Sequence, residues 1–236
     1  MSVKQSFDPS ADTKARVIAA ATHLFATKGI EAVAVRELTT IAGVNLAAVN
    51  YHFGSKNALC EAVLDSVAAS VNAKRLAKLE VVLREAESMG KPPGLPDILD
   101  TFMEPYLGPD ETREGAVLAQ LVIKDRISRN EMTTRIIRKH FDPLARKYIA
   151  AFAKACPHVD PTEFYWRYML MYGAVVLAST DRGKNNRIAT MSKGLLDASD
   201  PVALRSALMN FLVPAISAPS GKTTQPAPTR LVKRQG

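Results

Sequence analysis

Residues 41–59, IAGVNLAAVNYHFGSKNAL, decide the fold that this sequence predicts. Gly43 is placed to end a helix over about 35–42, and Gly54 to end a very short helix over about 46–52. A helix of about seven residues is not stable alone, so neighbouring helices must hold it. Its front is slim because it carries two alanines, and one slim helix fits the major groove of DNA, about 12 Å wide. The stretch therefore predicts the turn and second helix of a helix-turn-helix.

An amphipathic helix over about 13–28 precedes this stretch and ends at Gly29. Its apolar face consists of Val17, Ala20, Ala21, Leu24 and Phe25, which recur at helical spacing. Ser55 can cap the following helix, which reads from 56 to about 88 and would span roughly 50 Å. A helix of that length exceeds what one small domain needs, so we expect it to link two domains.

Further helical segments follow at about 95–107, 111–127, 131–155, 161–181 and 201–217, and no stretch alternates like a strand. The sequence thus predicts an all-α fold, with a three-helix helix-turn-helix head and a larger helical ligand-binding and dimerisation domain. The expected divisions are a flexible N-terminal arm (1–12), the DNA-binding head (13–59), the larger domain (60–218) and a disordered basic tail (219–236).

Composition limits the alternatives. Of the 236 residues, 47% are apolar and only 6% aromatic, which suits a helical core. About half of the net charge of +8 lies in 219–236, so bulk charge alone is weak evidence for nucleic acid. No run of 18 apolar residues predicts a membrane span and no apolar stretch predicts a signal peptide, so we expect a cytoplasmic protein without membrane contact. Cys60 and Cys156 are expected to be buried free thiols.

Two rival functions are weighed against DNA binding: an enzyme and a helical adaptor that binds only protein. No Ser/His/Asp grouping, metal-ligand spacing or glycine-rich phosphate loop emerges, so we expect no catalytic residue, metal or cofactor. An adaptor would bind DNA weakly and without regard to sequence, and that behaviour distinguishes it from a regulator.

The segment from Tyr51 to Lys56 offers groups that suit DNA phosphates. Tyr51 and His52 carry a hydroxyl and a ring N–H. Lys56 lies in the first turn of a helix, where a cation opposes the helix dipole unless an anion docks there. The alternatives are that Tyr51 packs in the core, that His52 is an ordinary interface histidine, that Lys56 is solvated, and that Asn45 only caps the short helix.

Residues 13–59 resemble the DNA-binding domain of the TetR family, in ARVIAAATHLFATKGIEAVAVREL (15–38) and in the stretch quoted first. Residues 43–56 are similar to PsrA-type members, which respond to fatty acids, and EFYWRYMLMYGAVVLAS (163–179) resembles their late dimerisation helix more loosely. Members often carry Thr or Ser where this chain has Ala34, so the resemblance does not supply that phosphate contact here. The resemblance assigns the contacts to DNA by position: Arg36 to a base or phosphate, Asn45, Leu46, Ala47 and Asn50 to base edges, and Tyr51, His52 and Lys56 to phosphates.

The segment 164–179 is apolar nearly all round, with Arg167 as its single charge. Such a helix is buried on several faces, either within one core or between the core and a second copy. The resemblance favours a homodimer built from 161–181 and 201–217, with an interface made by Tyr168, Tyr172, Gly173, Val176, Leu208 and Leu212.

A set of apolar side chains that includes flexible methionines predicts a hydrophobic effector such as a fatty acid or its coenzyme A thioester. The expected lining consists of Phe102, Met103, Leu118, Leu121, Val122, Trp166 and Met169, together with Met171. A basic cluster from Arg126 to His140 could hold the acidic group of that effector, or could be a plain solvated face. Other hydrophobic effectors, or a filled core without a ligand, stay open. With the head, these features predict a repressor that a small molecule releases from a pseudo-palindromic operator.

Overall fold

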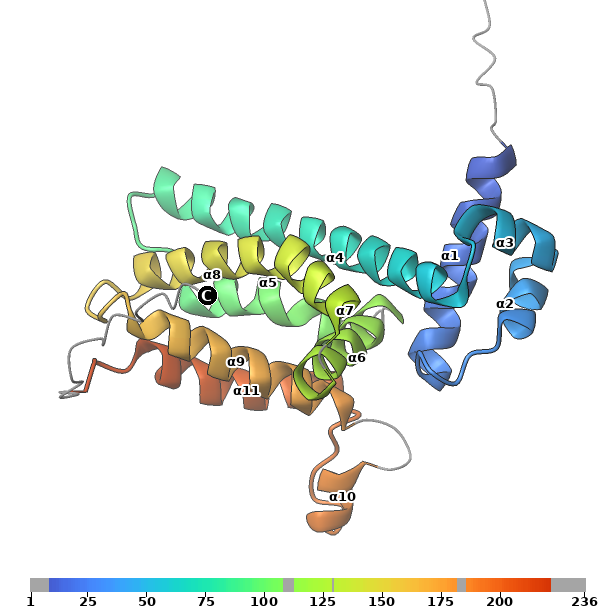
Figure 1. The fold of residues 1–236 in the computed structure, drawn as a ribbon. Helices are drawn as coiled ribbons and strands as arrows, with labels where there is room; N and C mark the ends of the chain where they lie inside the picture. Colours follow the sequence, from blue (N-terminus) through green and yellow to red (C-terminus); the bar gives the residue numbers. More distant parts are fainter. Residues whose placement is uncertain (1–8, 108–112, 129, 182–185, 222–236) are drawn as a thin grey trace, which may run out of the picture.

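The computed structural model describes residues 9–107, 113–128, 130–181 and 186–221 (Figure 1). The helices of these ranges are α1 (Pro9–Lys28), α2 (Val35–Ala42), α3 (Leu46–Phe53), α4 (Lys56–Ser88), α5 (Leu95–Leu107), α6 (Arg113–Ile127), α7 (Glu131–Ile136), the π-helical turn η1 (Ile137–Phe141), α8 (Asp142–Ala155), α9 (Glu163–Thr180), α10 (Arg187–Met191) and α11 (Pro201–Ser217). No strand occurs in the described part, so the all-α prediction is confirmed.

Both ends of the chain differ from the expected divisions, because residues 219–221 of the predicted disordered tail are described and the Oγ of Ser220 accepts a hydrogen bond from the N–H of Asp160 at 2.9 Å. Helix α1 begins at Pro9, four residues before the expected start of the head, so residues 9–12 of the predicted arm are helical. The rest of that arm, 1–8, and residues 222–236 of the predicted tail lie outside the described residues.

The head consists of α1, α2 and α3 at one end of the molecule, and α4 runs from it along the body (Figure 1). Its small core is formed where the apolar face of α1 meets one or two residues from each short helix: Val17, Ala21, Leu24, Phe25, Leu38, Val49 and Phe53. Gly43 and Gly54 both have positive φ, 63° and 74°, a region that other residues rarely adopt. The glycines therefore end α2 and α3 at the predicted places.

Helix α4 has 33 residues and begins where the Oγ of Ser55 accepts a hydrogen bond from the N–H of Ala58 at 3.1 Å. Its head end buries Leu59 and Val63, and its far end buries Leu79. Helices α5, α6, α8, α9 and α11 pack with α4 into the body, with α9 and α11 side by side along one face (Figure 1). Helix α4 therefore contributes buried apolar residues both at the head and along the body, within one continuous hydrophobic core.

The helix expected over 131–155 is interrupted by the wide turn η1. Pro143 follows this turn and cannot donate the usual bond to the carbonyl of residue 139, with which its ring would also clash in a regular helix. Widening the turn avoids that clash, and the carbonyl of His140 accepts a hydrogen bond from Asn72 Nδ2 of α4 at 3.0 Å. The interruption therefore connects α4 to the body.

Helix α10 lies within the segment expected to be a plain connection, 182–200. It has only five residues and shows too little periodicity to be predicted. Asn186 caps it through a bond from the Ala189 N–H, and the carboxylate of Asp181 accepts from the N–H groups of Arg187 and Ile188. Local capping therefore holds α10 in place of a long apolar face.

Candidate nucleic-acid interface

Helix α3 presents one face to the head core and the opposite face to solvent. Val49 and Phe53 are buried, while Tyr51 is 85% exposed and Leu46 45% exposed. Ala47 and Asn50 are also exposed. The residues predicted to read base edges thus share an open face on a helix that the head fixes from behind, and the alternative of Tyr51 as a core residue is wrong.

Asn45 has a capping role. Its Oδ1 accepts the N–H of Ala48 at 2.7 Å and so begins α3. Ala34, at the corresponding position of α2, makes no side-chain cap, as expected for alanine. One helix of the motif is therefore capped by a side chain and the other is not.

The side chains assigned to phosphates surround the open face of α3. Arg36 on α2 and Lys56 at the start of α4 are exposed, and His52 is half-buried with its ring edge-on to Tyr51 at 5.2 Å between centroids. The Lys56 Nζ lies 3.5 Å from the carbonyl of Glu31, at the limit of a hydrogen bond. That weak contact leaves the ammonium group able to meet an anion at the N-terminus of α4.

The turn between α2 and α3 is held by a residue that sequence reasoning missed. Arg16 of α1 donates through Nη2 to the carbonyls of Ala42 and Gly43, at 2.6 and 2.8 Å. These are orphan carbonyls at the C-terminus of α2, where a cation also complements the helix dipole. The sequence gives no signal for this contact beyond an arginine on the first helix, because its partners lie 26 and 27 residues away.

Gln120 of α6 joins the head to the body. Its amide donates to the carbonyl of Phe25 at 2.9 Å and accepts from the N–H of Ile30 at 3.3 Å, so it bridges the end of α1. Beside it, Lys124 forms an ion pair with Glu31 and thereby holds the pKa of that carboxyl below its ordinary value. A shift of α6 would therefore move the head directly.

Two family models match the chain. Residues 17–63 match "Bacterial regulatory proteins, tetR family", and residues 100–215 match "Tetracyclin repressor-like, C-terminal domain". Together they cover about two thirds of the chain, including the helix-turn-helix and most of the body. The chain belongs to the TetR family. It is thus a transcriptional regulator of the kind that combines a DNA-binding head with a ligand-binding domain.

Solved structures agree at the level of the fold. A transcriptional regulator from Saccharomonospora viridis, in complex with choline, has a TM-score of 0.65 at 14% identity, over 86% of this chain and 96% of its own. A transcriptional regulator from Rhodococcus sp. Rha1 has a TM-score of 0.57 at 24% identity, over 85% and 96%. A TetR-family regulator from Rhodococcus sp. has 0.58 at 16% identity, over 88% and 100%. Comparison with curated proteins gives no significant match.

The predicted effector lining divides into two groups in this TetR body. Phe102, Met103, Leu118, Leu121, Val122 and Met171 are buried in its core. Trp166 and Met169 are 60% and 44% exposed on the outer side of α9, so their placement in the interior is corrected. The physical reason is that α9 is apolar nearly all round, so the pattern alone does not show which stripe faces inward.

Most of the residues predicted for the dimer interface face the interior of the subunit and not its surface. Val176, Leu208 and Leu212 are buried within the subunit. Tyr168 and Tyr172 are half-buried and turn inward, with ring centroids 6.0 and 6.4 Å from that of Phe102. Gly173 lies on the exposed side of α9, with open space where a side chain would begin. The predicted helices do carry an exposed apolar face, but most of the residues named for it face the core.

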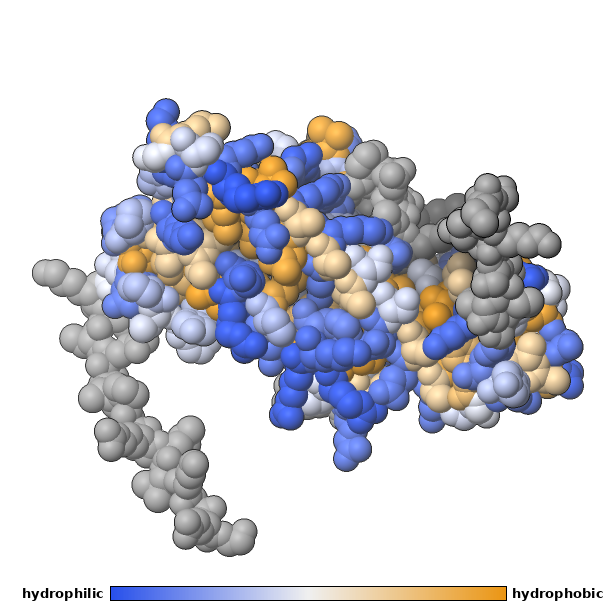
Figure 2. Space-filling model, turned by 90° about the horizontal axis from the view of Figure 1, so that it is seen from above, coloured by the Kyte–Doolittle hydropathy of each residue, from blue (hydrophilic) through white to orange (hydrophobic). Residues whose placement is uncertain are grey.

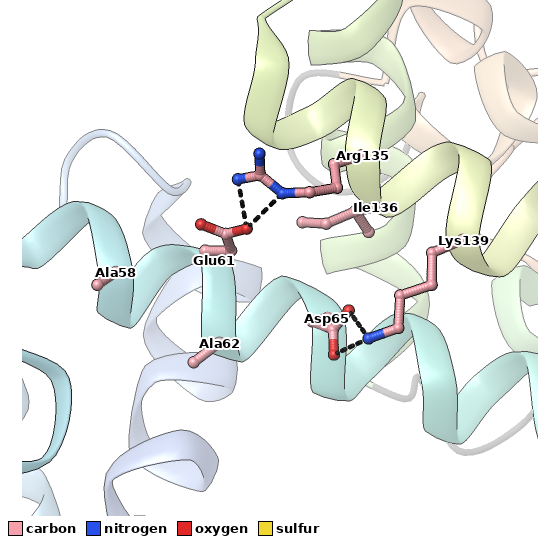
Figure 3. A pocket seen from close by; sticks show the side chains of 7 residues that line it. All are labelled: Ala58, Glu61, Ala62, Asp65, Arg135, Ile136 and Lys139. Atoms are coloured by element: carbon pink, nitrogen blue, oxygen red, sulfur yellow. Dashed lines mark hydrogen bonds and ion pairs between the residues drawn. The ribbon is translucent and has the colours of Figure 1, made fainter.

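Three residues of the basic cluster from Arg126 to His140 form ion pairs with carboxylates of α4, and two of these pairs are drawn in Figure 3. Arg135 pairs with Glu61 at 2.6 Å, and Lys139 and His140 pair with Asp65 at 2.8 and 2.7 Å. Burial alone would raise the pKa of Asp65, but the bonds from Lys139 and His140 hold it below its ordinary value. These three basic residues fasten α4 to α7 and η1, and the effector-binding role expected of the cluster stays a prediction.

Other expectations concern cysteines, metals and membranes. Cys60 and Cys156 are free and buried, as predicted, and burial raises the pKa of both thiols. The described residues hold no group of three or more His, Cys, Asp or Glu side chains that could bind a metal ion. Within the same ranges, no helix combines the length and apolar character needed to cross a bilayer.

Proposed function

We propose that this TetR-family chain is a homodimeric repressor that binds a pseudo-palindromic operator through α3 and leaves it when the body binds a hydrophobic acid. The observation that carries the DNA-binding role is the open face of α3. Leu46, Ala47, Asn50 and Tyr51 are all exposed there, while Val49 and Phe53 anchor the helix. A helix of eight residues with a slim front fits the major groove.

The residues around α3 suit the DNA backbone. Arg36, His52 and Lys56 come from three different helices and border the open face of α3. Contacts to phosphates fix register and orientation, whereas contacts to base edges specify sequence. We therefore assign Asn50 to base reading and Lys56 to phosphate binding. Asn45 can cap α3 and contact DNA at the same time, because only its Oδ1 serves the cap and its amide nitrogen is still free to donate.

The dimer is proposed to form through the outer face of α9 and α11. Trp166, Leu170 and Leu177 follow one another at helical spacing on α9 and are 60 to 70% exposed. Phe211 on α11 is 64% exposed, and Gly173 offers room for close approach of two helices. By contrast, the face that carries α4 is mostly hydrophilic, with smaller hydrophobic patches (Figure 2). An apolar stripe of this length on two adjacent helices indicates a partner surface, and a two-fold dimer would present two heads to one duplex.

The effector class is proposed from the buried lining around Phe102, Met103 and Leu118 and from the similarity of residues 43–56 to PsrA-type regulators. The regulator from Saccharomonospora viridis, which has a similar fold, was solved with choline bound. We propose that the body of this chain likewise holds a small molecule. Release from DNA then requires that the molecule bind better to the arrangement of heads that does not fit the operator.

A gel-shift experiment with the DNA flanking its own gene tests this function. The ligand-free protein should bind one site tightly and resist competition from random DNA. Tyr51→Ala should weaken this binding, whereas Tyr165→Ala, which removes another exposed tyrosine ring, from α9, should bind DNA normally as long as the protein is dimeric. Weak, sequence-blind binding would favour the adaptor, and turnover of a substrate would favour an enzyme.

A further inference from the structure

Arg75 is a charged side chain in the interior of the body. It lies on α4, is only 1% exposed and is the largest fully buried side chain of the described residues. A guanidinium group stays protonated in proteins. A buried positive charge normally has a carboxylate partner, because burial without one costs free energy. None of the ion pairs found in the described ranges involves Arg75, so its charge has no protein counter-ion there.

The hydrogen bonds of Arg75 leave the Nε–H of the guanidinium without a partner. Nη2 donates to the carbonyl of Phe102 at 2.9 Å, and Nη1 donates to Oδ1 of Asn72 at 3.2 Å. Nε is buried and has no hydrogen-bond partner. The edge formed by Nε and Nη2 has the geometry that matches the two oxygens of a carboxylate, and Nη2 carries a second hydrogen besides the one that it donates to Phe102.

Aromatic rings surround the charge. The guanidinium carbon lies 4.6 Å from the ring centroid of Phe102 and 4.7 Å from that of Tyr106. Tyr148 packs edge-on against Phe102 at 5.3 Å, and its hydroxyl lies 2.9 Å from Thr101 Oγ1. Burial raises the pKa of Tyr148 to about 12, against an opposing effect of the Arg75 charge. The ring stays a neutral phenol at physiological pH and supplies no counter-ion.

We propose that Arg75 binds the carboxylate of an apolar organic acid, which enters as the free acid and not as its coenzyme A thioester. This inference rests on the proposed function and names the effector class. The aromatic rings would pack against the apolar body of the ligand, and the guanidinium would bind its head group. A thioester has no negative charge at the acyl end, so it would leave the Arg75 charge unpaired.

A depression of about 460 Å³ lies on the neighbouring side of α5 and suits the apolar body of such a ligand. Its lining combines Thr101, Met103, Leu107, Pro201 and Val202 with the charged Lys78, Asp100, Glu104 and Arg205. Thr101 is the residue whose hydroxyl meets that of Tyr148, so the depression ends close to the aromatic rings. The charged residues of this lining form ion pairs, Lys78 with Glu104 and Arg205 with Asp100, whereas Arg75 lies outside the lining and forms no ion pair within the described ranges.

The same contacts connect the proposed site to the head. Asn72 accepts from Arg75 and donates to the carbonyl of His140 in η1. His140 in turn bonds the Asp65 carboxylate nearer the head end of α4, at 2.7 Å. A ligand that drew Arg75 toward itself would therefore disturb both η1 and α4, and α4 leads directly to α3.

Thermal shift with matched ligand pairs tests the proposal. The probes are decanoate and 3-phenylpropionate, their methyl esters, and decanoyl coenzyme A. One or both acids should raise the Tm of the wild-type protein and release it from DNA, and the responding acid tells an aliphatic from an aromatic body. The esters and the thioester should do neither. Equal stabilisation by acid and ester, or no response to either acid at millimolar concentration, would overturn the proposal.

Variants provide the second arm of the test. Arg75→Met keeps an unbranched apolar stem that is two atoms shorter, removes the charge and should weaken acid binding by about tenfold or more. Arg75→Lys, which keeps the charge, should retain part of the binding and serves if the first variant unfolds. The control Arg138→Met removes an exposed arginine of the basic cluster and should respond like wild type. Full acid binding by Arg75→Met would refute the assignment.

The two proposals fail separately. Ligand-free protein that binds its operator but ignores both acids would leave the regulator intact and remove the Arg75 site. Protein that binds acid through Arg75 but shows no specific binding to DNA would do the reverse.

Discussion

Replacing Gly43 by alanine should destabilise the turn that places α3, for two reasons that can be separated. The backbone at Gly43 has φ 63° and ψ 39°, a left-handed conformation that costs alanine about 1 kcal/mol. An added Cβ would also lie 2.7 Å from Nη2 of Arg16, which is too close for non-bonded atoms. Arg16 would therefore have to leave the carbonyls of Ala42 and Gly43.

The two lost hydrogen bonds are worth about 0.5 kcal/mol each, at the low end of the usual range because Arg16 is solvent-exposed. Gly43→Ala should thus cost about 2 kcal/mol in total, or about 30-fold in the ratio of closed to open turn. In an Arg16→Ala background the clash is absent, so the same change should cost only the backbone strain. The coupling energy expected between the two positions is about 1 kcal/mol.

Hydrogen exchange of peptides from 35–53 measures this local opening, with peptides from α8 as an internal reference that should not change. The four proteins of the cycle are wild type, both single variants and the double variant. Additive effects, with a coupling energy below about 0.3 kcal/mol, would show that Arg16 does not hold the turn. A cost of the Gly43→Ala change near zero would refute the geometry of the turn itself.

Three further outcomes follow from the structure. Lys56→Ala should lower the slope of log affinity against log salt by about one unit, whereas Asn50→Ala should keep that slope and relax sequence preference at one or two operator positions. Binding titrations in graded NaCl measure the slope, and an unchanged slope for Lys56→Ala would contradict its phosphate role. Leu170→Glu should yield monomers by light scattering at micromolar concentration, whereas the exposed control Val81→Glu on α4 should stay dimeric; a dimeric Leu170→Glu protein would place the interface elsewhere. The pKa of Asp65 is lower in the folded protein than in the unfolded chain. The ionised carboxylate therefore contributes its full share of folding stability above its ordinary pKa near 3.9, and this contribution is lost as the pH falls through the folded-state pKa. Between pH 7 and 3, the Tm of the wild-type protein should therefore exceed that of Asp65→Asn by an amount that shrinks below about pH 4. A Tm difference that stays constant over this range would argue against the ion pairs.

Local signals predicted most of the fold. Gly43 and Gly54 mark the ends of α2 and α3, and Ser55 marks the start of α4, because backbone conformation and capping at these residues depend on near neighbours. Helix α10 and the wide turn η1 were not predicted. The first is too short to show a period, and the second depends on how one proline and a side chain of α4 meet in space.

The site residues were predictable only on helices where apolar and polar residues alternate clearly, because that pattern shows which face is exposed. Asn50 and Tyr51 stand out because they follow buried Val49, whereas Trp166 and Tyr172 lie on a helix that is apolar nearly all round. The partners of the basic cluster lie about 74 residues away, so their neutralising carboxylates were invisible in the sequence. Arg75 gave no signal at all, since an arginine on a long charged helix is ordinarily solvated.

Selection of binding sites from a random DNA library by the purified full-length protein tests the central claim most directly. If α3 of two subunits reads the major groove, the enriched sequences should share a pseudo-palindrome with half-sites about one helical turn, or a little more, apart. The Asn50→Ala protein should then enrich a site that is degenerate at one or two symmetric positions. Enrichment of no sequence, or of a single asymmetric element that Asn50→Ala enriches equally, would contradict the account.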